Sequence, residues 1–326
     1  MTGSRAKWGM QCNLVKKGRS MISETVVRAL KGYTKEENIH LEEPMCNYTT
    51  FRVGGPADCL IEIGTKEELQ RICRYLNLTG IPFFVMGNGS NLLVSDKGYR
   101  GVILRVQSGM NQVRVEGRRV IAQAGATMAQ VARVAMEHGL SGLEFASGIP
   151  GTIGGGVVMN AGAYDGEMRQ VVRNVEVLSA EGEFWNLENE TMEFGYRTSS
   201  IKGKPYVVTE VELALTEGDP AQIKAVMDGF AAKRREKQPL EYPSAGSTFK
   251  RPEGFFAGKL IQDAGLRGYF VGGAQVSEKH CGFVINTQPG TTTAADIMTL
   301  IRHIQQVVKD KFDIMLESEV IFLGEF

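Results

Sequence analysis

Two glycine-rich stretches constrain the fold of this chain more than any other part of its sequence. The first, GNGSNLL, covers residues 87–93 after the apolar run PFFVM, and the second, SGIPGTIGGGVVMNAGAYDGE, covers residues 147–167. Bare backbone amides in such a loop can wrap the phosphates of a nucleotide or flavin. Gly, Asn and Ser also dominate ordinary tight turns, and the first stretch taken alone fits that alternative better.

The second stretch differs from a flexible linker because apolar residues stand between its glycines. Ile149, Ile153 and Val157 interrupt the glycines, whereas a linker would be polar. Glycines in apolar surroundings indicate buried backbone that another group approaches closely.

The residues after GNGSNLL exclude the common nucleotide-binding folds. In a dinucleotide-binding fold the motif GxGxxG opens a helix, whereas here the chain continues into the strand-like runs NLLVS and GVILRV. The chain also lacks GxxxxGK(S/T), the P-loop motif. The sequence is therefore compatible with a nucleotide ligand but not with a doubly wound sheet.

Charge and cysteine content narrow the classes of function. The 37 basic residues balance 37 acidic ones, so neither nucleic acid nor an anionic membrane is expected as a partner. No apolar run reaches the length of a membrane span. The five cysteines are scattered without CxxC or Cys/His clusters, which predicts a reduced cytoplasmic protein with no metal site. Residues 1–20 are basic and lack the apolar core of a secretory signal, so we expect a solvated N-terminal tail.

Strand-like and helical patterns are combined in a way that predicts an α+β protein. Short β-rich runs and one helical segment fill residues 53–125, an amphipathic helix follows at 127–140, and strands resume up to about residue 214. Helical patterns then dominate, up to the long helix TAADIMTLIRHIQQVVKDKF and the strand-like IMLESEVIFLG. We expect a Gly-rich ligand region over 21–217, a smaller α/β domain over 218–313 and a C-terminal strand over 314–326.

Two loops carry polar residues suited to chemistry. Arg197 in FGYRTSS is of a type most often found at the surface, but Arg also binds a carboxylate through two hydrogen bonds and keeps its charge. Ser247 in PSAGSTFKRP is not part of GxSxG and has no histidine nearby in sequence, so acyl transfer is not expected. Ser247 is either an ordinary turn residue or a proton donor.

The stretch IMLESEVIFLG places two carboxylates on one face of a predicted strand. Alternation puts Glu317 and Glu319 beside Met315 and Ile321. If that face is buried, desolvation and like-charge repulsion raise a carboxyl pKa. If it faces water, both are ordinary solvated glutamates, and the residues alone slightly favour this alternative.

Several blocks in this order together resemble one family, the UDP-N-acetylenolpyruvoylglucosamine reductases or UDP-N-acetylmuramate dehydrogenases. The blocks are YTTFRVGGPA, GNGSNLLVSDKGYRGVIL, SGIPGTIGGGVVMNAGAYDGE, YRTSS, PSAGSTFKRP, AGKLIQDAGLRGYFVGGAQVSEKHCGFVIN and LESEVIFLG. The resemblance extends from about Tyr48 to the end and is to the subfamily with a short substrate loop. It implies an FAD-binding domain of the vanillyl-alcohol oxidase type, a substrate-binding domain over 218–313 and a C-terminal strand that returns to the site.

The resemblance also implies cofactors, substrate and cellular role. NADPH reduces FAD, and hydride then passes to UDP-N-acetylglucosamine enolpyruvate, which gives UDP-N-acetylmuramate for peptidoglycan precursor synthesis, a cytoplasmic step of cell wall biogenesis that supports cell shape and division. The FAD is expected to be non-covalent because neither Gly-rich block contains a histidine. The residues expected to contact FAD are Arg52, Gly54, Gly87, Asn88, Gly89, Ser90, Asn91, Leu92, Gly148, Ile149, Pro150, Gly151, Gly154, Gly155, Asn160, Ala161 and Val208.

The catalytic roles that the resemblance implies fall on three residues. Arg197 and Glu319 stabilise charge on the substrate carboxylate, and Ser247 donates the proton. Glu319 is selected over Glu317 because the family glutamate directly precedes a valine. Tyr164, Lys237 and Arg251 match substrate contacts.

Two positions depart from the family pattern. Ser318 stands where many members have Pro between the glutamates, and Arg251 stands where some have Asn.

Two other functions fit part of the pattern. One is a flavin oxidoreductase of the same fold with another substrate, and the other is a non-catalytic flavin or nucleotide-binding module.

Overall fold

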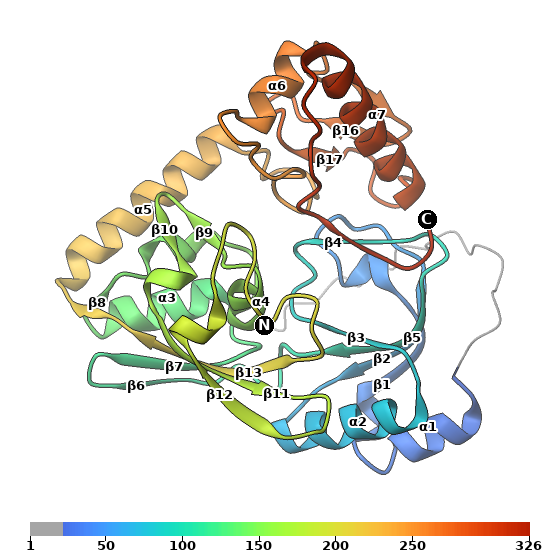
Figure 1. Ribbon diagram of the computed structural model, residues 1–326, viewed down its shortest axis with the longest axis vertical. Helices are drawn as coiled ribbons and strands as arrows, with labels where there is room; N and C mark the ends of the chain where they lie inside the picture. Colours follow the sequence, from blue (N-terminus) through green and yellow to red (C-terminus); the bar gives the residue numbers. More distant parts are fainter. Residues whose placement is uncertain (1–21) are drawn as a thin grey trace, which may run out of the picture.

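The computed structural model describes residues 22–326, and the tail expected over residues 1–20 lies outside them. Two sheets with their covering helices form the larger part of the protein, and a C-terminal region (residues 239–312) stands above them (Figure 1). The last segment of the chain descends from the C-terminal region to the part of the protein that contains the first sheet, here called the first sheet region (Figure 1).

The first sheet has four strands in the order β1-β2-β5-β3, with β1 antiparallel to β2 and the other pairs parallel. Its strands are β1 Ile39–Pro44, β2 Pro56–Glu62, β5 Tyr99–Arg105 and β3 Phe83–Met86. The helix α2 (Lys66–Thr79) connects β2 to β3, while α1 (Glu24–Leu30) precedes the sheet. The Thr65 side chain caps α2 by accepting from the Glu68 N–H, and Gly80 ends it in the left-handed conformation.

The second sheet has five antiparallel strands in the order β12-β11-β13-β7-β6. Its strands are β12 Phe184–Glu188, β11 Val172–Leu178, β13 Val207–Ala214, β7 Arg119–Gln123 and β6 Val113–Glu116. The helices α3 (Met128–Glu137) and α4 (Ile153–Val158) pack against it. The amphipathic helix expected at 127–140 is therefore confirmed, and its apolar face, including Met128 and Val131, is buried.

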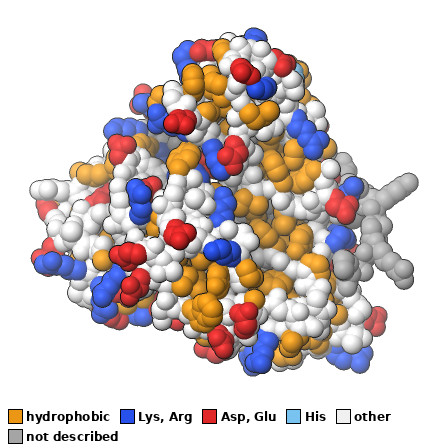
Figure 2. Space-filling view, in the orientation of Figure 1, with side chains coloured by type: hydrophobic (Ala, Val, Ile, Leu, Met, Phe, Trp, Pro, Cys, Tyr) orange, Lys and Arg blue, Asp and Glu red, His pale blue; other side chains and the backbone are white. Residues whose placement is uncertain are grey.

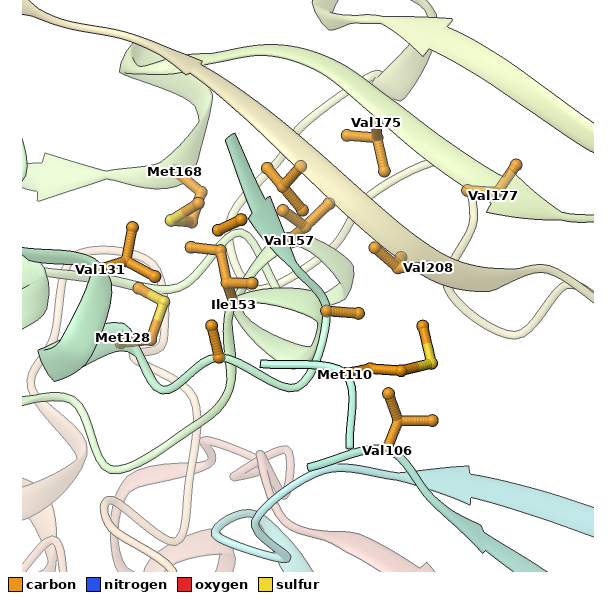
Figure 3. Close-up of a cluster of buried hydrophobic side chains, with 14 of the residues drawn as sticks. Val106, Met110, Met128, Val131, Ile153, Val157, Met168, Val175, Val177 and Val208 are labelled. Carbon is orange, nitrogen blue, oxygen red and sulfur yellow. The ribbon is translucent and has the colours of Figure 1, made fainter. Parts of the chain in front are cut away.

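One cluster of buried apolar side chains joins both sheets to α2, α3 and α4. Figure 3 shows part of it, where side chains of the second sheet and of the helices meet. The labelled residues are Val106, Met110, Met128, Val131, Ile153, Val157, Met168, Val175, Val177 and Val208. Ile153 and Val157, from the second Gly-rich block, have no solvent exposure, which confirms that this block is buried backbone rather than a linker.

The C-terminal region has its own core around α7 (Ala294–Phe312), packed on α6 (Ala257–Asp263) and a three-stranded sheet. The strands of that sheet are β15 Phe270–Val271, β16 Ala274–Val276 and β17 Val284–Asn286. Thr293 and Asp296 form a capping box at the start of α7. Asp96, from the first sheet region, also accepts hydrogen bonds from the N–H groups of Ala294 and Ala295, at 2.7 and 2.9 Å.

Two further contacts fasten the C-terminal region to the first sheet region. The ring of Phe51 is fully buried in the core of the C-terminal region, and the Asn286 side chain donates to the Phe51 carbonyl at 2.9 Å. The C-terminal segment (residues 314–326) supplies the second contact, because β18 (Ile321–Leu323) pairs in parallel with β4 (Leu92–Val94). The strand expected over 314–326 is thus limited to three residues, preceded by a single bridge between Ser318 and Phe249.

The helix α5 (Pro220–Lys237) spans the distance between the second sheet and the C-terminal region (Figure 1). Ile223 is buried, and the rings of Tyr164 and Phe230 stack with centroids 4.2 Å apart. By its packing α5 belongs with the first 217 residues, although the sequence groups it with the domain over 218–313. The remaining short elements are β8 Leu140–Ser141, β9 Gly162–Ala163, β10 Gly166–Glu167, β14 Thr216–Glu217, η1 Glu36–Asn38, η2 Met45–Asn47, η3 Glu144–Gly148, η4 Met168–Gln170 and η5 Asn189–Met192.

No helix within residues 22–326 is long and apolar enough to cross a membrane. No group of three or more His, Cys, Asp or Glu side chains in the same range could hold a metal ion.

We predict that Phe51→Ala destabilises the C-terminal region. Removing a fully buried ring costs about 3–5 kcal/mol because a cavity remains in the core. Urea unfolding followed by circular dichroism measures the loss. Phe270→Ala is the control, because Phe270 is 69% exposed and its removal should change the free energy of unfolding by less than about 0.5 kcal/mol. Equal effects of the two variants would contradict the role given to Phe51.

Candidate active site

The C-terminal segment brings Glu319 between two loops that are distant in sequence. The Glu319 N–H donates to the Thr248 carbonyl at 2.9 Å, next to Ser247. On the other side, the Asn91 side chain donates to the Glu319 carbonyl at 3.0 Å, and the Ile321 N–H donates to the Asn91 carbonyl at 3.0 Å. Glu319 is therefore held by backbone bonds between the Ser247 loop and the first Gly-rich loop.

Arg197 lies in a tight hairpin formed by residues 195–198. Gly195 and Thr198 exchange backbone hydrogen bonds of 3.1 and 3.3 Å, and Arg197 has a left-handed φ of 55°. The Asn160 side chain, 1% exposed, donates to the Gly195 carbonyl at 3.0 Å. The second Gly-rich block thus anchors the hairpin that carries Arg197.

Arg197 and Glu319 form an ion pair at the junction of these segments. Arg197 Nε donates to Glu319 Oε1 at 2.9 Å, and Arg197 Nη2 donates to the Gly162 carbonyl at 3.1 Å. Only 23% of the Arg197 side chain and 16% of the Glu319 side chain are exposed. Figure 2 shows basic and acidic side chains next to one another near the centre of this face, below the C-terminal region.

The structure separates the two carboxylates that the sequence placed on one face. The Glu317 side chain is 70% exposed and pairs with Lys250, whereas Glu319 is largely buried. Their surroundings differ because bonds to Thr248 and Asn91 hold Glu319 between two loops, whereas Glu317 lines the pocket beside Arg251. Of these two glutamates, only Glu319 is largely buried.

Burial raises the pKa of Glu319 above its usual value. The nearby cations Arg197, Lys202 and Lys250 act in the opposite direction but do not cancel the effect of burial. A carboxyl with a raised pKa can carry a proton closer to neutrality and can then donate it.

Ser247 is exposed and directly precedes Thr248, whose carbonyl binds the Glu319 N–H. Its neighbour Thr248 is fully buried, and the Thr248 N–H donates to the Gly282 carbonyl at 2.8 Å. Gly246 on its other side has a φ of +77° with open space around it. The Ser247 hydroxyl therefore belongs to an anchored loop and still faces solvent.

Arg251 lies at the edge of the same site. Its N–H donates to the Tyr196 hydroxyl at 3.1 Å, and its guanidinium lies 4.0 Å from the centroid of the Phe256 ring. A pocket of about 390 Å³ opens here, lined by Tyr196, Lys250, Arg251, Pro252, Glu253, Met315 and Glu317. The other two predicted substrate contacts lie toward α5: Tyr164 donates from its hydroxyl to the Phe230 carbonyl, and Lys237 is exposed at the helix end.

The two Gly-rich blocks meet each other. The Asn88 side chain donates to the Pro150 carbonyl at 2.5 Å, and Gly87 packs against Thr152 so closely that a side chain would collide. Ser90 lies next to Gly151, and Asn91 leads through Leu92 into β4. The first Gly-rich loop therefore packs directly on the start of the second block, just before α4.

The other predicted cofactor contacts have mixed surroundings. Arg52 is exposed with a φ of 55°, and Gly54, with a φ of 129°, packs on Val94. Val208 is 6% exposed in the core, and Ile149 and Ala161 are partly buried against that core. Gly148 packs on the Arg234 side chain, and Gly154 packs on Ala124.

The glycines fall into two groups by what surrounds them. A methyl group on Gly89 would collide with the Tyr48 carbonyl, and Gly89 has a φ of +61°, so the chain itself requires glycine there. Gly155 is exposed, and the nearest atom to an added methyl group would be Thr152 Oγ1 at 3.6 Å. The protein's own packing leaves room beside Gly155, which fits a bound group lying against this backbone.

Lys202 and Lys250 are two members of the site that sequence reasoning missed. Lys202 Nζ donates to the Arg197 carbonyl at 3.1 Å, and the Lys250 N–H donates to the Glu317 carbonyl at 2.9 Å. Both lysines stand within five residues of a predicted catalytic residue, at Arg197 and Ser247. That proximity was the only signal, and exposed lysines are common enough in loops to hide it.

Comparison with known proteins identifies both halves of the chain. Residues 57–188 match the model of an FAD binding domain, and residues 238–323 match that of the UDP-N-acetylenolpyruvoylglucosamine reductase C-terminal domain. The reductase of this name from Caldanaerobacter subterraneus is 51% identical over 304 residues, covering 93% of this chain and all of that protein. The Clostridioides difficile protein of the same name is 47% identical over 305 residues, 94% of this chain and all of that protein.

A solved structure gives the same result. The crystal structure of UDP-N-acetylenolpyruvylglucosamine reductase from Thermus caldophilus has a TM-score of 0.75 and 36% identity, and the match covers 88% of this chain and 98% of that one. The fold and the site therefore define an FAD-dependent oxidoreductase. The chain belongs to the UDP-N-acetylenolpyruvoylglucosamine reductase family. The α+β fold, the FAD cofactor and the family predicted from sequence are confirmed.

We predict that alanine at Gly89 and at Gly155 produces opposite defects. Gly89→Ala should lower the free energy of unfolding by more than about 1 kcal/mol, because the new side chain is strained and collides with backbone. Gly155→Ala should leave stability unchanged or raise it by up to about 1 kcal/mol, since Gly155 lies in α4.

In Gly155→Ala the defect should appear in cofactor binding instead. We expect FAD affinity to fall about tenfold or more, equivalent to roughly 1.4 kcal/mol. Thermal unfolding of the apoprotein and flavin fluorescence titration measure the two quantities. Unchanged FAD affinity in Gly155→Ala would exclude close approach of the cofactor at this glycine.

Proposed function

We propose that this chain reduces UDP-N-acetylglucosamine enolpyruvate to UDP-N-acetylmuramate with NADPH as electron donor, in the cytoplasmic synthesis of peptidoglycan precursors. The observation that carries the proposal is the largely buried Arg197–Glu319 pair, held between the Ser247 loop and the Gly-rich loops. Bound FAD supplies the hydride chemistry. The residues proposed to hold it are those of the two Gly-rich blocks, Arg52, Gly54 and Val208.

Arg197 is proposed to bind the carboxylate of the enolpyruvyl group. Its Nε and Nη2 atoms are occupied by Glu319 and the Gly162 carbonyl, while Nη1 makes no hydrogen bond within residues 22–326. A guanidinium held from one side offers its remaining donors in a fixed direction. Negative charge that develops on the substrate carboxylate would then meet a donor that does not need to reorganise.

Glu319 is proposed to act in its protonated form. An ionised carboxylate would repel an enolate, whereas a protonated one donates a hydrogen bond to it. Burial favours the protonated form by raising the pKa of Glu319. As the pH rises through that pKa, Glu319 loses its proton and this stabilisation is lost.

Ser247 is proposed to donate the proton that completes saturation of the double bond. Its side chain is exposed and its backbone is anchored through Thr248, whose carbonyl also binds the Glu319 N–H. The hydroxyl proton goes to the carbon next to the one that receives hydride, and solvent then restores it. Tyr164, Lys237 and Arg251 are proposed to bind the sugar nucleotide.

The visible spectrum of the purified protein tests the whole proposal. Anaerobic NADPH should bleach the FAD band, and UDP-N-acetylglucosamine enolpyruvate should then restore it. Flavin that stays bleached after this substrate is added would mean a different substrate. A protein that binds no flavin even when FAD is supplied would refute the cofactor assignment as well.

We predict that Arg197→Lys lowers turnover by about 10²–10³-fold, comparable to the loss of one transition-state hydrogen-bond donor. A lysine keeps the positive charge but loses the two-pronged geometry. Steady-state kinetics measure the loss, and the flavin content should not change. Arg169→Lys is the control, since the Arg169 side chain is 57% exposed and lies outside the proposed machinery. Near-normal turnover in Arg197→Lys would remove Arg197 from the mechanism.

We predict that Ser247→Ala separates the two half-reactions. Flavin reduction by NADPH should proceed at the normal rate, while reoxidation by the enolpyruvyl substrate slows about 10²–10⁴-fold, the usual contribution of a general acid. Stopped-flow absorbance follows both steps, with Ser244→Ala from the same loop as control. An equal loss in both half-reactions would point to a folding role for Ser247.

A further inference from the structure

Lys202 contacts the backbone of the hairpin that carries Arg197. Lys202 Nζ donates to the Arg197 carbonyl at 3.1 Å. Arg197 is a non-glycine residue with a φ of 55° at the turn of the hairpin, a conformation that L-residues adopt only when their surroundings hold it. The contact therefore acts on one of the two peptide groups that flank the Arg197 Cα and together set the direction of its side chain.

The other anchors of this hairpin hold its ends rather than its turn. The Asn160 side chain binds the Gly195 carbonyl, and Ser199 Oγ donates to the Val158 carbonyl at 2.8 Å. Within residues 22–326, Lys202 provides the only side-chain hydrogen bond to the Arg197 carbonyl. Removing that ammonium group would leave the stem of the hairpin in place and free the turn.

The charges around Lys202 are those of the site itself. Burial lowers the pKa of Lys202, as does the nearby Lys250, while Glu317 and Glu319 oppose the shift. Lys250 has its own partner in Glu317, and Lys202 forms no salt bridge with any acid in the described part of the chain. Its positive charge therefore remains available to the interior of the site.

We propose that Lys202 is a positioning residue: its ammonium group anchors the Arg197 peptide and keeps the guanidinium against Glu319. The proposal rests on the reductase reaction proposed above. The charged groups that face Glu319 are Arg197 and Lys202 from one segment and Lys250 from another, with Glu317 two residues away on its own segment. Loss of Lys202 removes one of the three cations that favour ionised Glu319.

The test compares Lys202→Met with Lys204→Met in the FAD-loaded protein. Methionine keeps the apolar stem of lysine and removes the ammonium group, and Lys204 is an exposed lysine two residues away. In Lys202→Met, reoxidation of reduced flavin by UDP-N-acetylglucosamine enolpyruvate should slow about 10–100-fold, as expected when a reacting group is misplaced by up to about 1 Å. Flavin reduction by NADPH and FAD affinity should stay within about twofold of wild type.

The pH profile of the flavin reoxidation rate provides a readout that a merely structural residue would not change. In this profile the rate should fall as Glu319 loses its proton, and that fall, the Glu319 limb, should be absent in Glu319→Gln. In Lys202→Met the limb should move to higher pH, because a cation that lowers the pKa of Glu319 has been removed. Lys202→Arg restores a positive charge and should return this limb toward its wild-type position. Lys204→Met should leave it unchanged.

Three results would count against these proposals in distinguishable ways. Wild-type enzyme whose reduced flavin is not reoxidised by the enolpyruvyl substrate would overturn the proposed function itself. Normal wild-type behaviour with equal rates and pH limbs in Lys202→Met and Lys204→Met would overturn the positioning role alone. A lower thermal midpoint with equal loss in both half-reactions and an unmoved pH limb would assign Lys202 a structural role instead.

Discussion

The rest of the site depends on the contact between Arg197 and Glu319, two residues separated by 122 positions in the chain. Burying two opposite charges costs desolvation energy that their attraction only partly returns, and losing one partner leaves the other uncompensated. Such a pair is therefore weak evidence for a gain in stability and stronger evidence that the two side chains are held in a fixed relative position. Each partner is also fixed through its own backbone, Arg197 by the hairpin over residues 195–198 and Glu319 by bonds to Thr248 and Asn91.

The C-terminal segment makes this contact available by connecting the two parts of the protein. It leaves the C-terminal region, pairs at Ser318 with Phe249, and continues beside β4. Because β4 directly follows the first Gly-rich loop, the same few residues link that loop, the Ser247 loop and Glu319. The buried Phe51 ring and the Asp96 cap of α7 hold the C-terminal region in place at the same side. Groups held by rigid elements can stabilise developing charge without reorganising first.

The Gly-rich blocks serve two physical purposes that their composition does not distinguish. At Gly87, Gly89 and Gly154 the neighbouring atoms of the chain exclude a side chain, so glycine is needed for the protein to close on itself. At Gly155 the space is open, and only a group from outside the chain would use it. The alternative of ordinary turns was therefore partly correct for the first block, although the family confirms that the chain binds FAD.

The sequence by itself determined the class of fold, the buried faces of α3 and α7, and the family, because local periodicity and ordered motifs depend only on neighbouring residues. It also excluded a doubly wound sheet, since strand-like residues follow GNGSNLL. Only the tertiary structure showed that Glu319 is buried while Glu317 is exposed, and only it revealed the contact of Lys202 with Arg197. Both depend on which segments meet in the folded chain, and a periodic pattern in the sequence does not encode that. The electrostatic environment of a carboxyl group is set by whatever surrounds it in space.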